Sequence, residues 1–158
     1  MAAATEDRFD VFVRQLRHSV NHDLPVANTD DEFYESTFAM INGSGELEPL
    51  THAAGDDDSG VVALAVLERQ DDEPFTGKFQ RDRGGSDPLV KAYSGAIIEF
   101  EINDSIGNYS IGDTVYAEDN QTVDAAQADG SAGSRPEAGT VYEVLDSTVK
   151  VYVPGILD

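Results

Sequence analysis

Short runs of apolar and β-branched residues, separated by turn residues, recur along the whole chain. Residues 33–41 combine aromatic and β-branched side chains, a composition that favours a strand. The turn sequence at 42–45 and the alternating residues 46–50 predict a short return strand. The unbroken apolar run at 61–67 predicts a central strand that is buried on both faces.

The second half of the chain repeats this pattern more regularly. Turn residues stand at 103–105 and 118–121, and Asp146-Ser147 is a two-residue connection of the kind that joins the strands of a hairpin. The strands expected around these turns are residues 96–102, 111–117, 122–125, 140–145 and 148–153.

Residues 7–24 are compatible with more than one structure. Apolar side chains occur at helical spacing at Phe9, Phe12, Val13, Leu16 and Val20. Residues 10–13 equally suit the start of a strand, and Pro25 biases Leu24 away from a helix. The segment is therefore expected to be a helix, a strand, or an arm that becomes ordered only against a partner.

Together these elements predict a mainly β protein, either a small β-barrel or a sandwich. We expect an N-terminal arm or short helix at 1–24 and a β domain at 25–158. Polar stretches rich in small residues are expected to form loops at 53–60, 69–91 and 126–138. Irregular segments as long as 69–91 are usually functional or mobile in a small domain.

The charge of the chain indicates the solvent conditions in which this β protein folds. Thirty-one Asp and Glu against ten Lys and Arg give a net charge of −21. The carboxylates are spread from Glu6 to Asp158, and the only lysines are Lys78, Lys91 and Lys150. Self-repulsion of this size destabilises a compact state in dilute buffer, but molar salt shortens the Debye length to about 3 Å and screens it. The composition indicates a halophilic protein.

Neither nucleic acid nor a membrane is expected as a direct partner. Phosphate binding needs a basic stripe, whereas the densest basic cluster, at 78–83, is offset by Asp82 and Asp87. The longest apolar run is too short to span a bilayer. The acidic N-terminal residues lack the features of a signal peptide, so synthesis and folding are expected in the cytoplasm. The chain has no cysteine, which excludes disulfides and thiolate metal sites.

Three histidines and one aspartate run are the candidates for proton transfer or metal binding. His18 and His22 would share a face of a helix, but the glutamate of a zinc-protease motif is missing between them. These two and His52 are interpreted as surface or interface residues. The run 56–58 could supply oxygen ligands to a hard cation, but it lacks the ligand spacing of a calcium loop. It is interpreted as a solvated loop, and no metal or cofactor is expected.

Catalytic motifs are also missing. The chain has no Gly-x-Ser-x-Gly elbow and no glycine loop that continues into Gly-Lys-Ser/Thr, and no carboxylate pair stands out as acid and base. An enzyme is therefore not expected, and a small accessory enzyme is the third alternative. Asn-x-Ser/Thr sequons occur at Asn42, Asn103, Asn108 and Asn120, and they are interpreted as turn chemistry rather than glycosylation sites.

The C-terminal part of the chain, about 92–158, resembles a known module. Its segments are Ser110-Ile111-Gly112-Asp113-Thr114-Val115-Tyr116, then Thr122-Val123, then Pro136 to Leu145, and the terminal Val149-Lys150-Val151-Tyr152-Val153. This pattern is similar to the β-module of capsid decoration (cement) proteins of tailed viruses. The resemblance implies a small β-barrel or β-tulip and, with the acidic composition, a tailed virus that infects haloarchaea.

The resemblance also implies a function. Such proteins sit on the outer surface of the virion, often as homotrimers, bind the major capsid protein and reinforce the shell. The corresponding expectation is a non-enzymatic structural protein of the capsid exterior, assembled in the host cytoplasm. The alternative is a β-type binding module of a virus tail or haloarchaeal cell surface, which recognises a receptor or a glycan. Tyr93, Tyr109 and Tyr116 are its loosely clustered aromatic candidates.

Overall fold

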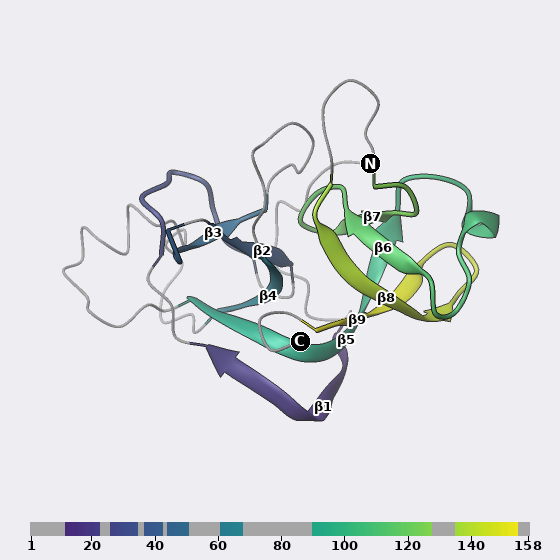
Figure 1. The fold of residues 1–158 in the computed structure, drawn as a ribbon, viewed down its shortest axis with the longest axis horizontal. Coiled ribbons are helices and arrows are strands. Elements are labelled where there is room, and N and C mark those ends of the chain that lie inside the picture. The colour runs from purple at the N-terminus through teal and green to yellow at the C-terminus, as the bar shows by residue number, and fades with distance from the viewer. Residues whose placement is uncertain are drawn as a thin grey trace.

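The computed structural model describes residues 12–22, 26–34, 37–42, 44–50, 61–67, 90–127 and 135–154. Side chains are described at 26–34, 37–42, 44–50, 95–127 and 135–154. The strands are β1 (Phe12–His22), β2 (Phe38–Ile41), β3 (Leu47–Pro49), β4 (Val61–Leu67), β5 (Val90–Ile102), β6 (Thr114–Ala117), β7 (Thr122–Asp124), β8 (Glu137–Val144) and β9 (Val149–Val153). A single 3₁₀ turn in these ranges, η1 (Ile106–Asn108), follows β5. The prediction of a mainly β protein is confirmed (Figure 1).

Five strands of the second half close into a barrel. Strand β5 pairs with β9, β9 with β8, β8 with β6, β6 with β7, and β7 returns to β5. The closing pair is parallel, with Glu101 opposite Thr122 and Ile102 opposite Val123, whereas the other four pairs are antiparallel. Closure removes the unpaired strand edges that an open sheet would expose. The small barrel anticipated from the sequence is therefore present.

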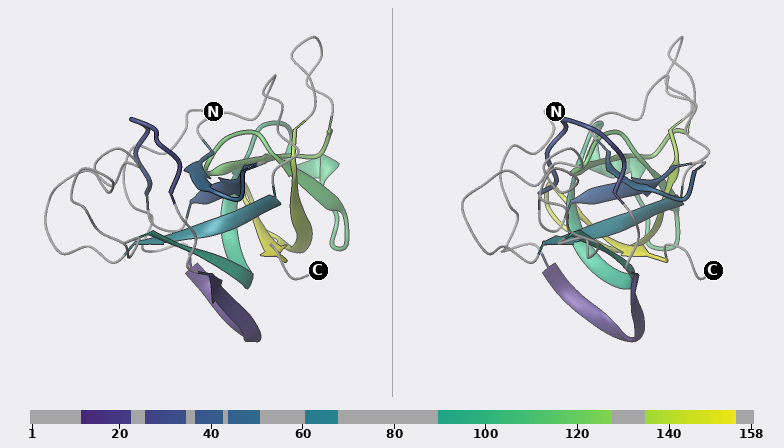
Figure 2. Two further views of the ribbon diagram at one scale, coloured as in Figure 1. Left: turned by 60° about the vertical axis from the view of Figure 1, so that its left-hand side comes forward. Right: turned by 90° about the vertical axis from the view of Figure 1, so that its left-hand side faces the viewer.

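The first half of the chain extends the same sheet away from the barrel. Strands run in the order β3-β2-β4-β5, and β1 lies on the other edge of β5, because Tyr93 pairs with both Leu64 of β4 and Asn21 of β1. Figure 2 shows β1 as the outermost of these strands. Strand β5 thus pairs with β4 in its first half and with the barrel strands β9 and β7 in its second half.

Gly95 lies where β5 passes from its pairing with β4 into the barrel. Pairing with β4 ends at Tyr93, and pairing with β9 begins at Ala96. Between them Gly95 has a φ of +74°, a conformation that costs other residues about 1–2 kcal/mol. This glycine lies at the point where β5 exchanges its neighbour β4 for β9 within one sheet.

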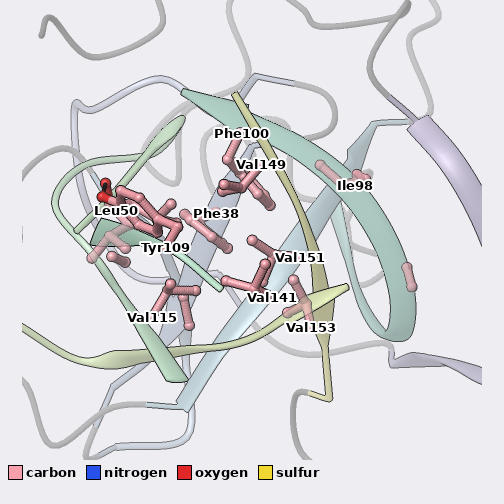
Figure 3. Close-up of a cluster of buried hydrophobic side chains, with 14 of the residues drawn as sticks. Phe38, Leu50, Ile98, Phe100, Tyr109, Val115, Val141, Val149, Val151 and Val153 are labelled. Atoms are coloured by element: carbon pink, nitrogen blue, oxygen red, sulfur yellow. Dashed lines mark hydrogen bonds between the residues drawn. The ribbon is translucent and has the colours of Figure 1, made fainter. Parts of the chain in front are cut away.

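One apolar core is common to both halves. Figure 3 shows Phe38 and Leu50 from the first half among the barrel side chains. The rings of Phe38 and Phe100 stack, with centroids 4.1 Å apart and planes 11° from parallel, and both side chains are fully buried. The amide of Phe38 donates to the carbonyl of Asn120 in the turn between β6 and β7, at 2.8 Å. The first half therefore fills the interior of the barrel as well as extending its sheet.

Most predicted hairpins are confirmed in pairing, with changes at their ends. The strand expected at 33–41 begins only at Phe38, and the hydroxyl group of Thr37, just before it, donates to the carbonyl of Tyr34 at 2.7 Å. The strand expected at 111–117 begins at Thr114, because Ser110–Asp113 form a turn with Gly112 at a φ of +93°. Conversely, β8 begins at Glu137, inside the loop expected at 126–138, and β5 begins at Val90, inside the one expected at 69–91.

The ambiguous N-terminal segment contains a strand. Strand β1 pairs with β5 in two stretches, and the register shifts between Gln15 and Val20. Of the three structures considered for 7–24, the helix is wrong for Phe12–His22. The helical spacing of the apolar residues there is overridden by pairing with β5, since tertiary contacts commonly outweigh local pattern.

Candidate functional site

Arg135 is a buried cation next to β8, at the end of the loop that follows β7. Its side chain is 5 % exposed and its Nε donates to Glu118. Its Nη1 donates to the carbonyl oxygen of Ala126 at 3.1 Å, and its Nη2 lies 3.5 Å from Oδ2 of Asp124. The backbone amide of Arg135 donates to the carbonyl of Gln127 at 2.8 Å. These contacts tie together the two ends of the loop.

Asp124 is held in place from the other side as well. Its Oδ2 accepts a hydrogen bond from Nδ2 of Asn103 at 2.9 Å, and its Oδ1 accepts one from the amide of Ala126 at 2.7 Å. Asp124 already has an amide side chain, a backbone amide and a nearby guanidinium as partners, which leaves it little capacity for a ligand. The arrangement is therefore a clamp that holds Arg135 against β7 and the residues just after it.

Replacing Arg135 with methionine is expected to lower the free energy of unfolding by about 3 kcal/mol, because it leaves two partly or fully buried carboxylates without their cation. Urea unfolding followed by circular dichroism in molar KCl measures this loss. Lys150→Met is the matched control, since Lys150 pairs with Glu143 at 2.5 Å on the barrel surface. A surface ion pair contributes little, so the control should lose far less stability. Equal losses in both variants would contradict the clamp.

Tyr109 makes hydrogen bonds to Asp104 and Val123, which adjoin Asn103 and Asp124 in the chain. Its ring is buried, and its hydroxyl group donates to a carboxylate oxygen of Asp104 and lies 3.1 Å from the carbonyl oxygen of Val123. Burial, followed by the hydrogen bond and charge of Asp104, raises the pKa of Tyr109 well above its usual value. The stability this group provides is fully present below about pH 10 and is lost as the pH rises through the raised folded-state pKa.

The histidine and aspartate candidates lie on β1, where only the backbone is described, or outside the described residues. His18 and His22 lie on a strand, so the shared helical face that would have let them clamp a metal does not exist. His52 and Asp56-Asp57-Asp58 lie outside the described residues. Among the side chains that the structure describes, no group of three or more His, Cys, Asp or Glu is placed to hold a metal ion.

The aromatic candidates for a glycan site are not arranged as a binding platform. Tyr109 is buried with its hydroxyl group engaged, and Tyr116 is half-buried on β6. The side chain of Tyr93 lies outside the described part of the structure, although its backbone is paired in β5. Stacking on a sugar needs exposed ring faces, which Tyr109 does not offer.

All four sequon asparagines are buried or make side-chain hydrogen bonds in the fold. Asn120 is buried, and Asn42 accepts hydrogen bonds from the amides of Ser44 and Glu46 within its turn, each at 3.0 Å. Asn103 donates to Asp124, as described above. Asn108 is exposed in η1 and donates to Asp104 at 2.8 Å. The interpretation of the sequons as turn chemistry fits Asn42 well.

Arg135 was not anticipated as an important residue. The pattern of small residues at 126–138 predicted a plain loop, and nothing in its apolar periodicity indicates a buried cation. One signal was available in the composition: Arg135 is the single basic residue between Lys91 and Lys150. In a stretch so rich in acidic residues, an isolated arginine is well suited to pair with a buried carboxylate.

Comparisons with known proteins give no relative. No protein-family model matches this chain, and neither the curated proteins nor the solved structures include a match. None of the helices in the described ranges is long and apolar enough to cross a membrane. The function must therefore be argued from the fold, the surface and the charge.

Proposed function

We propose that this protein is a structural virion component that binds the outer surface of the capsid of a tailed virus as the homotrimer that the resemblance implies, and that it stabilises the shell. The observation that carries the proposal is the closed barrel. Residues resembling the decoration module form β6 to β9 and close on β5, which is the architecture the resemblance implies. The acidic composition supports a virus of haloarchaea.

Stabilisation of the shell follows from mass action. A protein that binds the assembled capsid but not its dispersed subunits shifts the equilibrium toward assembly. Surface carboxylates would keep the particle hydrated in brine, where added salt screens their repulsion. The partners in this proposal are the major capsid protein and further copies of the same chain, with neither nucleic acid nor a membrane involved.

Strand β1 is proposed as the arm that reaches the capsid. Within the described part of the chain it pairs with β5 alone, so its second edge has no strand beside it. Residues 11–22 contain Arg14 and Arg17 and no carboxylate, although the whole chain has a charge of −21. Such a segment is repelled least by the acidic surface expected of a halophilic capsid. An edge that has no neighbouring strand in the described ranges offers backbone donors and acceptors for strand addition.

Removing residues 1–24 is expected to abolish binding to the shell while the barrel stays folded. Purified shells stripped of this protein are mixed with each variant in molar KCl and sedimented, and the bound fraction is measured. A variant that lacks only residues 1–11 keeps β1 and serves as the matched control, which should bind as the full chain does. Circular dichroism verifies that both variants are folded. Undiminished binding without residues 1–24 would refute the role of the arm.

The same assay addresses the alternative function. A tail or cell-surface binding module would leave the shells unbound even as the full chain, and would instead be retained on immobilised haloarchaeal glycans. Retention of the full chain on glycans, together with absence from the shells, would replace the capsid proposal by this alternative.

A further inference from the structure

Asn42 directly follows strand β2 and is the only asparagine of the chain that precedes a glycine. The backbone nitrogen of the residue after an asparagine can attack the side-chain carbon Cγ, because the new bond closes a five-membered ring. Glycine at that position places no side chain in the way. Gly43 lies outside the described residues and enters here only through its covalent bond to Asn42. The sequence therefore singles out Asn42 as the asparagine most open to this reaction.

The turn after β2 holds the side-chain carbonyl group of Asn42 between two hydrogen-bond donors. Its Oδ1 accepts from the backbone amides of Ser44 and Glu46, each at 3.0 Å. Attack on Cγ converts Oδ1 into an oxyanion, and two backbone amides at this distance are the arrangement that stabilises an oxyanion in acyl transfer. The hydrogen bonds that close the turn therefore also polarise the carbonyl group that the reaction attacks.

The backbone of the turn fixes these donors in place. The amide of Asn42 donates to the carbonyl of Glu46, and the amide of Gly45 donates to the carbonyl of Asn42, both at 2.9 Å. Gly45 has a φ of +77°, which glycine adopts without strain. Donors that are already in position need no reorganisation when negative charge develops on Oδ1, so their stabilisation is obtained in full.

The nitrogen that must leave lies near a carboxylate. Nδ2 of Asn42 donates to Oε2 of Glu48 in β3, at 3.4 Å. The leaving nitrogen becomes positively charged as it takes up a proton, and a neighbouring negative charge stabilises that form. Asn42 is half-buried and Ser44 is exposed, so water, the second reactant, can reach the turn.

We propose that Asn42 is a site of spontaneous deamidation that the folded turn promotes. The backbone nitrogen of Gly43 forms a bond to Cγ of Asn42 and gives up its proton to water, while Nδ2 takes up a proton and leaves as ammonia. The resulting succinimide ring adds one molecule of water and opens to aspartate or isoaspartate. Water is the only co-reactant, and the inference does not depend on the proposed capsid role.

The product alters the hairpin of β2 and β3. Its new carboxylate replaces the amide group that donates to Glu48, so two like charges adjoin. Isoaspartate also adds one carbon atom to the backbone, next to the paired residues Ile41 and Leu47. Leu47 is fully buried, so the modification is expected to loosen the packing of this hairpin as the protein ages.

Incubation of the full chain in molar KCl at neutral pH, followed by peptide mapping with mass spectrometry, measures deamidation at each asparagine. Asn42 should react about tenfold faster than in a synthetic peptide of residues 38–47, which has the same sequence without the folded turn. Asn108 is the internal control. Its side chain is exposed, but the bulky Tyr109 follows it, so it should stay intact over the same period.

Two variants test the role of the neighbouring carboxylate. Glu48→Gln should slow the reaction at Asn42 several-fold, because it removes the negative charge beside Nδ2 and keeps the shape of the side chain. Glu137→Gln removes the same charge from an exposed position of β8 and should leave the rate unchanged.

The comparison of protein with peptide decides the proposal. If Asn42 of the folded chain reacts no faster than the peptide, the hydrogen bonds to Oδ1 do not promote the reaction, and the proposal is overturned. An unchanged rate in Glu48→Gln would overturn the part assigned to the carboxylate. If that variant does not fold by circular dichroism, the rates of the unchanged protein and the peptide decide alone.

Discussion

Gly139→Ala should lower the free energy of unfolding by about 3 kcal/mol or more, enough to unfold much of the protein at moderate temperature. Gly139 lies on β8 opposite Val115 of β6, in the wall of the barrel. A Cβ atom built there would lie 2.0 Å from the backbone carbonyl oxygen of Tyr152 and 3.1 Å from a methyl group of Val151. The clash is with the backbone of β9, which cannot move without breaking its pairing with β5.

Gly107→Ala is the matched control for this substitution. A Cβ atom at Gly107 would meet no atom within 4 Å, and the residue lies in the exposed 3₁₀ turn. Thermal unfolding in molar KCl, followed by circular dichroism, compares the two variants. The control should unfold within a few degrees of the unchanged protein. A Gly139→Ala variant of near-normal stability would mean that β8 and β9 are not in such close contact.

Phe38→Ala should lower the free energy of unfolding by about 3–5 kcal/mol, because it leaves a cavity against the fully buried ring of Phe100. Urea unfolding in molar KCl measures the loss. Ile111→Ala, at an exposed turn position, is the control and should change stability by less than about 0.5 kcal/mol.

A double-mutant cycle with Phe100→Ala tests the stack itself. Because the rings are in contact, the two losses should not add, and the coupling should be about 0.5–1.5 kcal/mol.

The same contact has a consequence for the C-terminal module. Residues 92–158 on their own lack Phe38, Met40 and Leu50, which belong to the core cluster. A fragment 92–158 that unfolds as cooperatively as the full chain would contradict a shared core.

The sequence was informative where pairing is local. The connection at Asp146-Ser147 predicts the β8–β9 hairpin, and the amide of Leu145 donates to the carbonyl of Thr148 at 2.9 Å across it. The turn at 118–121 is equally local, with the amide of Glu118 donating to the carbonyl of Thr122 at 2.9 Å. Turn residues and alternating patterns predict pairing between segments that are close in the chain, so these hairpins could be predicted from the sequence.

Features that depend on distant pairing were not predictable in this way. Strand β7 is only three residues long, and no local pattern shows that it returns to β5 in parallel and closes the barrel. The strand expected at 96–102 would leave Gly95 outside it, whereas Gly95 lies within the long strand β5. Likewise, the exposed position of Tyr142 depends on a bulge that only the opposing strand reveals. These three features therefore required the structure.

The position of β5 in the chain bears on how the protein is made. Strands β1, β4, β7 and β9 all pair with β5, which begins at Val90. While the ribosome is still translating the first half, β1 and β4 have no β5 to pair with, and Phe38 has no Phe100 to stack on. The nascent chain must keep these apolar strands from aggregating until β5 and the barrel strands emerge. Folding is consequently dominated by contacts between distant parts of the sequence, which makes it slow, and it completes only after synthesis has passed β9.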